Sequence, residues 1–175
     1  MSVPPTQPPA PPVEPAPPAA PAAPAKADVG KRIIAAIIDG IPAIILALVL
    51  GLVPFIGPLV GGLAVAAWWL FRDGLDVDFA DHRSLGKKVM KLRPVTADGR
   101  PIDLATSAKR NLPLAIYAAG YFLWVIPVLG HLASIPVFLL GSLVVLVEAV
   151  LVFTDPAGRR WGDKFAGTTV VEVAS

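Results

Sequence analysis

Cysteine is absent from the 175-residue chain, which excludes disulfides, thiolate metal sites and thiol nucleophiles. Charged residues are also few, because Asp, Glu, Lys and Arg make up 16% of the sequence whereas 55% is hydrophobic. The mean hydropathy of +0.68 is a value that soluble globular domains rarely reach. Since so few charges cannot cover a surface that faces water, part of the surface is expected to face lipid.

The first 28 residues contain no run of large hydrophobic side chains and consist mainly of Pro and Ala. This composition is typical of a disordered tail rich in polyproline II conformation. The segment also lacks the basic start and the long apolar run of a secretory signal. We interpret residues 1–28 as a solvated tail, with a spacer or a PxxP ligand for a partner as the alternative.

Ionisable residues are nearly missing from two long stretches. From Ile33 to Phe71 the only one is Asp39, and from Asn111 to Phe153 they are Tyr117, Tyr121, His131 and Glu148. Each stretch is about twice the roughly 20 residues that cross the hydrocarbon, and Pro and Gly interrupt each one near its middle. We predict an all-α membrane protein with four transmembrane helices, at about 33–52, 56–71, 111–126 and 133–153, in two hairpins.

Lys and Arg are missing from both predicted hairpin turns. Three precede the first helix, nine lie in the segment 72–110 and three follow Phe153. By the positive-inside rule, both termini and the segment 72–110 are predicted to be cytoplasmic, in a multi-pass protein of the cell (inner) membrane. The bilayer is thus the first expected partner, and nothing indicates nucleic-acid binding.

The two halves of the membrane domain, residues 29–173, resemble each other. Pro54, Gly57 and Leu59 recur as Pro127, Gly130 and Leu132 at an offset of 73, and Arg83, Gly86 and Lys88 recur as Arg159, Gly162 and Lys164 at an offset of 76. Short strand-like tails follow, at 92–96 and 168–173. We expect two tandem parallel repeats, with short cytoplasmic amphipathic and strand-like elements and any site at the interface between units. Chance similarity is the alternative.

Asp39 is the acidic residue inside the first predicted helix, and Arg32 shares its face two turns away. A lone carboxylate at this depth costs at least about 2.5 kcal/mol, so Asp39 is expected to find a partner, with Arg32 and Arg110 the nearest cations by depth. Gly40 and Pro42 permit a kink that frees carbonyls. Asp39 is therefore either a cation or proton site or a structural clamp between helices. Glu148 is expected to pair with an interfacial cation.

No motif for catalysis, for metal binding or for a cofactor rises above background. The acidic residues of 73–81 lack the spacing of an EF-hand, and Gly86-Lys87-Lys88 lacks the features of a phosphate-binding loop. We predict a protein that is not an enzyme. Four basic residues are expected to contact lipid headgroups: Lys87, Lys88, Arg159 and Arg160.

These residues resemble the RDD family of membrane proteins, which is named for one arginine and two aspartates. The arginine that opens the first helix and the first aspartate within it match Arg32 and Asp39, and the family's Ser-x-Gly-Lys element looks like Ser84-Leu85-Gly86-Lys87. The closing element looks like the segment 160–168, which carries Asp163 with Gly162 in place of the usual His. The resemblance covers about residues 28–173.

The resemblance implies transport of unidentified ligands, sodium/proton exchange, or a role as an assembly or accessory factor. Our leading hypothesis is a transport protein in which Asp39 is a cation or proton site and Arg32 sets its charge state, with Asp163 as the third residue. Arg110, Glu148 and Asp155 are secondary candidates. The competing hypothesis is a non-transporting scaffold in which these charges clamp the helices. Because four helices enclose little volume, a homo-oligomer or a membrane-protein partner is also expected.

Overall fold

The computed structural model describes residues 26–54, 56–124 and 126–173. The first hairpin comprises α1 (Val29–Gly51) and α2 (Gly57–Phe71), and the second comprises α5 (Ile116–Trp124) and α6 (Leu129–Thr154). The hairpins are joined by α3 (Leu85–Val89), β1 (Leu92–Thr96), α4 (Leu104–Asn111) and the 3₁₀ helix η1 (Leu112–Ala115), and α7 (Trp161–Phe165) and β2 (Thr168–Glu172) follow α6. The predicted tail lies almost entirely outside the described residues.

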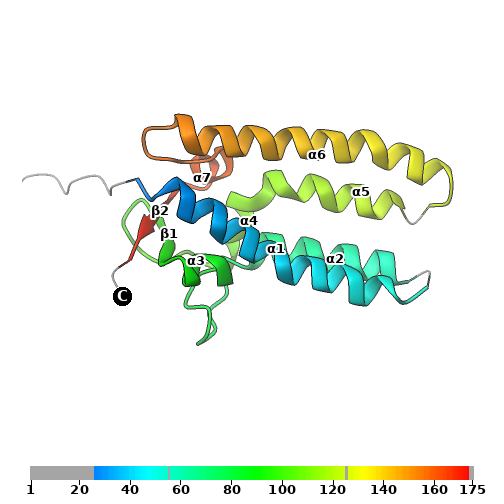
Figure 1. Ribbon diagram of the computed structural model, residues 1–175, viewed down its shortest axis with the longest axis horizontal. Helices are drawn as coiled ribbons and strands as arrows, with labels where there is room; N and C mark the ends of the chain where they lie inside the picture. The colour runs from blue at the N-terminus through cyan, green and yellow to red at the C-terminus, as the bar shows by residue number, and fades with distance from the viewer. Residues whose placement is uncertain (1–25, 55, 125, 174–175) are drawn as a thin grey trace, which may run out of the picture.

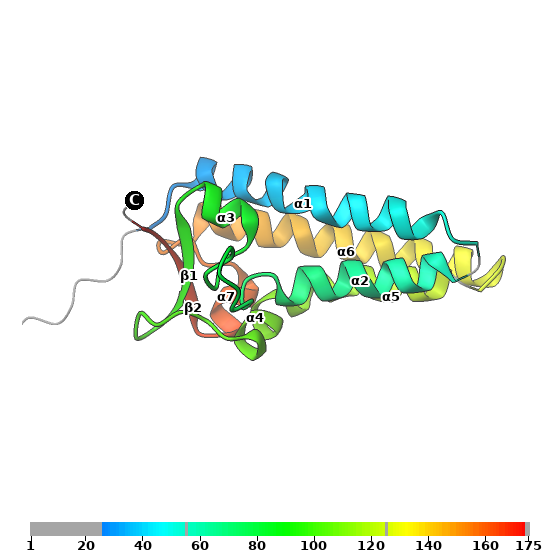
Figure 2. The same cartoon turned by 90° about the horizontal axis from the view of Figure 1, so that it is seen from below.

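The short elements gather at one end of the helices, which we call the capped end. Figure 1 shows α3, α7, both strands and both ends of the described chain there, with the two hairpin turns at the opposite end. The hairpins contact each other mainly through α2 and α5, whereas α1 and α6 have little direct contact. The view from below shows the same order of elements along the long axis (Figure 2).

Two helices, α1 and α6, are long and apolar enough to cross a membrane. Their large side chains face outward along most of their length, as shown by Ile37, which is 64% exposed, and Leu139, which is 66% exposed. Helix α2 is apolar but has only 15 residues. The predicted third helix, at about 111–126, is helical over most of its length but is not a single α-helix. The 3₁₀ helix η1 precedes α5 there, because Pro113 has no N–H to continue an α-helical ladder.

The two hairpin turns have matching backbone geometry. Val53 N donates to Leu50 O at 3.1 Å, and Ile126 N donates to Leu123 O at 3.0 Å, at the offset of 73 residues. Glycine follows in both turns because a Cβ on Gly57 would lie 2.1 Å from Leu50 O and one on Gly130 would lie 2.0 Å from Leu123 O. Each turn therefore brings its two helices into contact through the same close backbone approach.

The segments α3–β1 and α7–β2 also match, at an offset of 76. Lys88 N donates to Ser84 O at 2.9 Å, and Lys164 N donates to Arg160 O at 3.0 Å. Lys91 and Gly167 then take positive φ values of 54° and 64°, which turn the chain out of each helix into its strand. The strands pair antiparallel, with Leu92 opposite Glu172 and Thr96 opposite Thr168. This pairing fastens the two halves together at the capped end.

A small apolar core lies where the sheet meets the start of α1. It consists of Ala27, Ala35, Leu92 and Val170, which are at most 2% exposed. Outside this core, the exposed faces of α3 and α7 carry Val89, Trp161 and Phe165, each more than half exposed. Such amphipathic elements are typical of a position at a membrane surface.

Candidate functional site: a charged cavity between the hairpins

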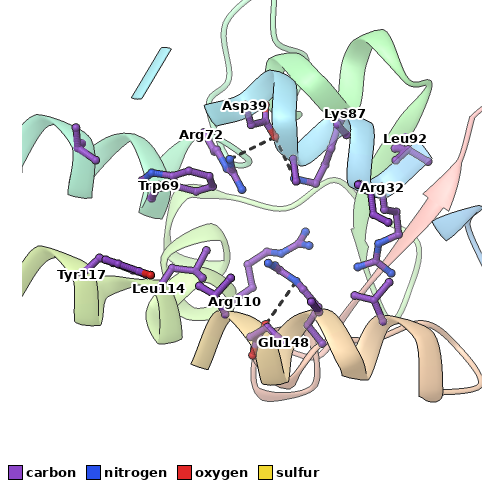
Figure 3. Close-up of a pocket in the computed structure, with 18 of the residues that line it drawn as sticks. Arg32, Asp39, Trp69, Arg72, Lys87, Leu92, Arg110, Leu114, Tyr117 and Glu148 are labelled. Carbon is purple, nitrogen blue, oxygen red and sulfur yellow. Dashed lines mark ion pairs between the residues drawn. The ribbon is translucent and has the colours of Figure 1, made fainter. Parts of the chain in front are cut away.

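A cavity of about 480 Å³ lies between the two hairpins near the capped end. Most of its wall consists of apolar and aromatic side chains from both hairpins and from η1, among them Val65, Leu114, Val145 and Val152. At the capped end the lining changes to charged groups: Arg32, Asp39, Arg72, Lys87, Arg110, Glu148 and Arg160. Figure 3 shows those of these side chains that it labels converging from α1, the end of α2, α3, α4 and α6 on one central space. The cavity thus joins a charged pole to an apolar body.

Asp39 is fully buried, and its carboxylate holds α3 against α1. One oxygen accepts the N–H of Gly86 at 2.8 Å, and the other accepts the hydroxyl of Ser84 at 2.6 Å. Because Gly86 N lies in the first turn of α3, the carboxylate acts as a cap on a helix N-terminus. Gly86 permits this contact, since a Cβ there would lie 1.9 Å from Ala35 O.

The cations beside Asp39 are not those that depth along the helix predicts. Arg72 Nη1 lies 3.4 Å from its second oxygen and Lys87 Nζ lies 3.9 Å from it, whereas Arg32 pairs with Asp163. Depth along the helix does not predict the partners of Asp39, because α3 folds back over α1 and places Lys87 beside the carboxylate. The backbone carbonyl of Asp39 is also used, since Trp68 Nε1 donates to it at 3.0 Å.

Asp163 lies in α7 and joins three arginines from distant parts of the chain. It lies 2.8 Å from Arg110 Nη2 and 3.2 Å from both Arg32 Nη2 and Arg160 Nη2. Burial raises the pKa of Asp163, but the three guanidinium groups lower it by more, so that the pKa lies well below its ordinary value. Asp163 is therefore ionised and connects the start of α1 with α4 and α7.

Glu148 gives α7 the same kind of contact that Asp39 gives α3. Its Oε1 accepts the N–H of Gly162 at 3.0 Å, and its Oε2 lies 3.6 Å from Arg160 Nε. A Cβ on Gly162 would lie 1.9 Å from Arg110 O, which explains glycine at this position. Glu148 thus pairs with a cation, Arg160, and its backbone contact with Gly162 is an addition to the predicted pair.

Arg72 and Asp73 belong to this cluster, and sequence reasoning missed both. Asp73 was missed because it opens a stretch of acidic residues that resembles a solvated loop. It is fully buried, 2.7 Å from Lys87 Nζ and 3.8 Å from Arg110 Nε. Burial raises the pKa of Asp73, but Lys87, Arg110 and Arg72 hold it well below its ordinary value. Burial lowers the pKa of Lys87 to about 8 although Asp73 opposes this shift. The sequence feature that could have identified Asp73 is its position directly after α2, next to Arg72.

Two guanidinium groups have nitrogens that bind nothing among the described residues. Arg110 is 1% exposed and Arg72 is 4% exposed, yet Arg110 Nη1 and Arg72 Nε have no hydrogen-bond partner there. Arg72 also lies over the ring of Trp69 at 4.0 Å. Figure 3 shows Arg72 and Arg110 entering the same space from opposite sides. A buried N–H group without an acceptor is energetically unfavourable, unless a bound ligand supplies the acceptor.

The remaining predicted site residues lie at different places. Lys87 and Arg160 line the cavity, at 12% and 16% side-chain exposure, where they pair with Asp73 and Asp163, and their contact with lipid headgroups stays a prediction. Buried carboxylates attract both side chains inward. Arg159 is 45% exposed, and Asp155 forms a turn after α6 with Arg159 N and Lys164. Among the residues that the structure describes, no group of three potential metal ligands gathers.

The sequence profile of the RDD family matches residues 26–167, a range that includes Arg32, Asp39 and Asp163. The chain belongs to the RDD family. This membership and its apolar helices make it a membrane protein. No curated protein and no solved structure matches the sequence.

Proposed function

We propose that this RDD-family protein is a transport protein that moves a small anionic ligand through the space between its hairpins. The buried, unpartnered guanidinium nitrogens at the cavity carry the proposal. Five cations line the described cavity, namely Arg32, Arg72, Lys87, Arg110 and Arg160, against the two lining carboxylates of Asp39 and Glu148. Asp73 and Asp163 lie behind them. The cluster therefore has room for one more negative charge, which free guanidinium donors would bind strongly.

The contacts of Asp39 favour this ligand over a cation. A bound cation needs free carboxylate lone pairs, but each oxygen of Asp39 already accepts a hydrogen bond, and Oδ2 also faces Arg72 and Lys87. In the proposed mechanism Asp39 holds the cap in place while the arginines meet the ligand. The cation or proton site first predicted at Asp39 becomes the less favoured form of the transport hypothesis.

A second space gives the cavity a continuation toward the hairpin turns. It has a volume of about 340 Å³, and its walls include Gly51, Gly57 and Trp124. Val65 and Tyr121 line both spaces. Tyr121 is held there because its Cβ lies close to Gly62, where an added Cβ would be 2.8 Å away. We infer that Val65 and Tyr121 form the constriction of the transport path.

The proposed topology places the protein in the cell membrane with four crossings and the capped end in the cytoplasm. All fifteen Lys and Arg residues belong to segments at the capped end and none to the hairpin turns, as the positive-inside rule requires. The α4–η1–α5 segment supplies the third crossing although it is not one continuous helix. The matching hairpin turns and matching α3–β1 and α7–β2 segments support two tandem units of equal orientation.

The test is flux into proteoliposomes that contain the purified protein. The probes are radiolabelled acetate, radiolabelled phosphate and a fluorescent lysophosphatidate whose leaflet is read by dithionite quenching. We expect flux of at least one probe above that of empty vesicles. Tyr121→Ala should raise it about tenfold, which corresponds to a barrier lowered by about 1.4 kcal/mol. Phe122→Ala, on the exposed face of the same helix, is the matched control and should leave flux unchanged.

A second candidate function is a non-transporting scaffold or accessory protein. The specific observation in its favour is that Asp39, Glu148 and Asp163 all bind elements of the same chain. In that case no probe crosses the membrane above the background of empty vesicles, and Tyr121→Ala changes nothing. That outcome would remove the transport proposal.

A further inference from the structure

The cavity is open on one side, between α1 and α6. These two helices have little direct contact, whereas the other neighbouring pairs in the bundle pack closely. Residues that line the cavity on this side are also exposed on the outside of the molecule: Ile33 at 46% and Phe153 at 58%. Ala36 and Ala149 line the same side and are exposed as well. Because α1 and α6 are the two candidate membrane spans, this opening faces the hydrocarbon in the proposed topology.

The chemistry of the cavity changes along its length. The pole beside Arg72 and Arg110 offers guanidinium donors that lack acceptors. The remaining wall is aliphatic and aromatic, with Val145, Val152 and Leu114 among its members. A fully polar anion would leave that wall without a partner, and a neutral hydrocarbon would leave the donors without one.

We propose that the cavity binds an amphiphilic anion, a molecule with a carboxylate or phosphate head and an aliphatic tail, which enters from the bilayer between α1 and α6. The head accepts hydrogen bonds from Arg72 and Arg110, and the tail lies along Val145 and Val152. This inference deepens the proposed function and rests on it for the direction of movement, but binding itself does not require transport. The small side chains of Ala36 and Ala149 keep the opening wide.

Binding is tested with the full chain in nanodiscs and a long-chain fatty acid that carries a photoreactive diazirine in its tail. We expect crosslinks to residues of α1 and α6 that line the opening, in the ranges 33–36 and 145–153. Unlabelled palmitate and phosphatidate should each compete, and their relative strength distinguishes a free fatty acid from a bilayer lipid as the source. Acetate, inorganic phosphate and hexadecanol should compete at least about tenfold less, since each lacks the tail or the charge.

Ala149→Phe tests the opening without removing a charge, and Arg72→Gln tests the binding of the head. Ala149→Phe fills the opening and should lower crosslinking about tenfold. Ala133→Phe is the matched control, because Ala133 is an exposed alanine of α6 outside the cavity, and it should leave crosslinking unchanged. Arg72→Gln should weaken competition by palmitate about tenfold and leave competition by hexadecanol unchanged.

Three outcomes would overturn the inference. They are equal competition by hexadecanol and palmitate, equal competition by acetate and palmitate, and crosslinks spread evenly over the lipid-facing surface that Ala149→Phe does not reduce. Crosslinking in the expected ranges without flux of any probe retains the inference and removes the transport proposal. Flux of acetate or phosphate without fatty-acid binding does the reverse.

Discussion

Asp39 shows how much one buried carboxylate organises in this protein. It binds a backbone N–H, a hydroxyl and two cations, and these partners come from α2 and from the segment around α3. Inside the bilayer such a group is costly unless it is fully paired. Its burial is therefore tolerated because the chain around α3 returns to meet it. A change at this position affects the elements that it joins.

Replacing Asp39 with Asn should destabilise the protein. The substitution removes the charge that faces Arg72 and Lys87, and loss of one partner of a buried ion pair costs about 3 kcal/mol. Thermal unfolding of purified protein measures the effect. Asp98→Asn is the control, because Asp98 pairs with Arg100 at an exposed site, where water and salt screen the pair and it contributes little to stability. An unchanged melting temperature for Asp39→Asn would contradict the role of Asp39 in holding α3 against α1.

Acid should weaken the turn after α6. The hydrogen bond from Lys164 and the N–H of Arg159 lower the pKa of Asp155 to about 2, from 3.8. A lowered folded-state pKa contributes stability above the unfolded value, and that contribution is lost as the pH falls from 3.8 to about 2. Asp155→Asn should thus unfold at a lower temperature than the wild-type chain at pH 7, and the difference should close near pH 2. A difference that is independent of pH would contradict this assignment.

At the scale of elements, α3 and α7 are held by the same device. Each short helix presents a glycine to the backbone of a longer helix, and a carboxylate accepts the glycine N–H. The carboxylates come from different places, Asp39 in α1 and Glu148 in α6. The two units therefore attach their short helices in the same way, but the carboxylate that accepts the glycine N–H comes from a different position in each unit.

Gly86→Ala should separate α3 from α1. Its Cβ would meet Ala35 O at 1.9 Å, and relief of such a clash costs about 1 to 3 kcal/mol and lengthens the contact with Asp39. Gly40→Ala is the matched control, since nothing lies within 4 Å of a Cβ there and alanine favours a helix by about 1 kcal/mol. Thermal unfolding should rank Gly40→Ala at or above the wild type and Gly86→Ala below it.

The sequence allowed some of these elements to be predicted and not others. Hydrophobic stretches with central Pro and Gly located both hairpins, because these patterns are local. The break at Pro113 was missed since apolar composition alone does not distinguish an α-helix from a 3₁₀ turn. Partners of Asp39 were missed because they depend on how α3 folds back. Asp73 was hidden among exposed acidic neighbours, and only burial reveals its role.

For the whole molecule, the proposed topology makes opposite ends accessible from opposite sides of the membrane. The chain has no native cysteine, so a maleimide labels this protein only at a cysteine that has been introduced. Leu52→Cys, at an 81% exposed site in the first hairpin turn, should react with an impermeant maleimide in intact spheroplasts. Ala97→Cys, in the exposed turn after β1, should react only after permeabilisation. The opposite labelling pattern would show that the orientation in the membrane is reversed. Labelling of both cysteines in intact spheroplasts would contradict the proposed topology.

The position of Asp163 after Arg32 and Arg110 in the sequence has a consequence for biosynthesis. Arg32 and Arg110 emerge from the ribosome long before α7, yet Asp163 is the carboxylate nearest to both. Until α7 is made, Arg32 lacks Asp163, Arg110 has only Asp73 beside it, and β1 lacks the strand with which it pairs. The membrane domain therefore closes last at its capped end, and a nascent chain that stops before Asp163 leaves Arg32 without its carboxylate partner.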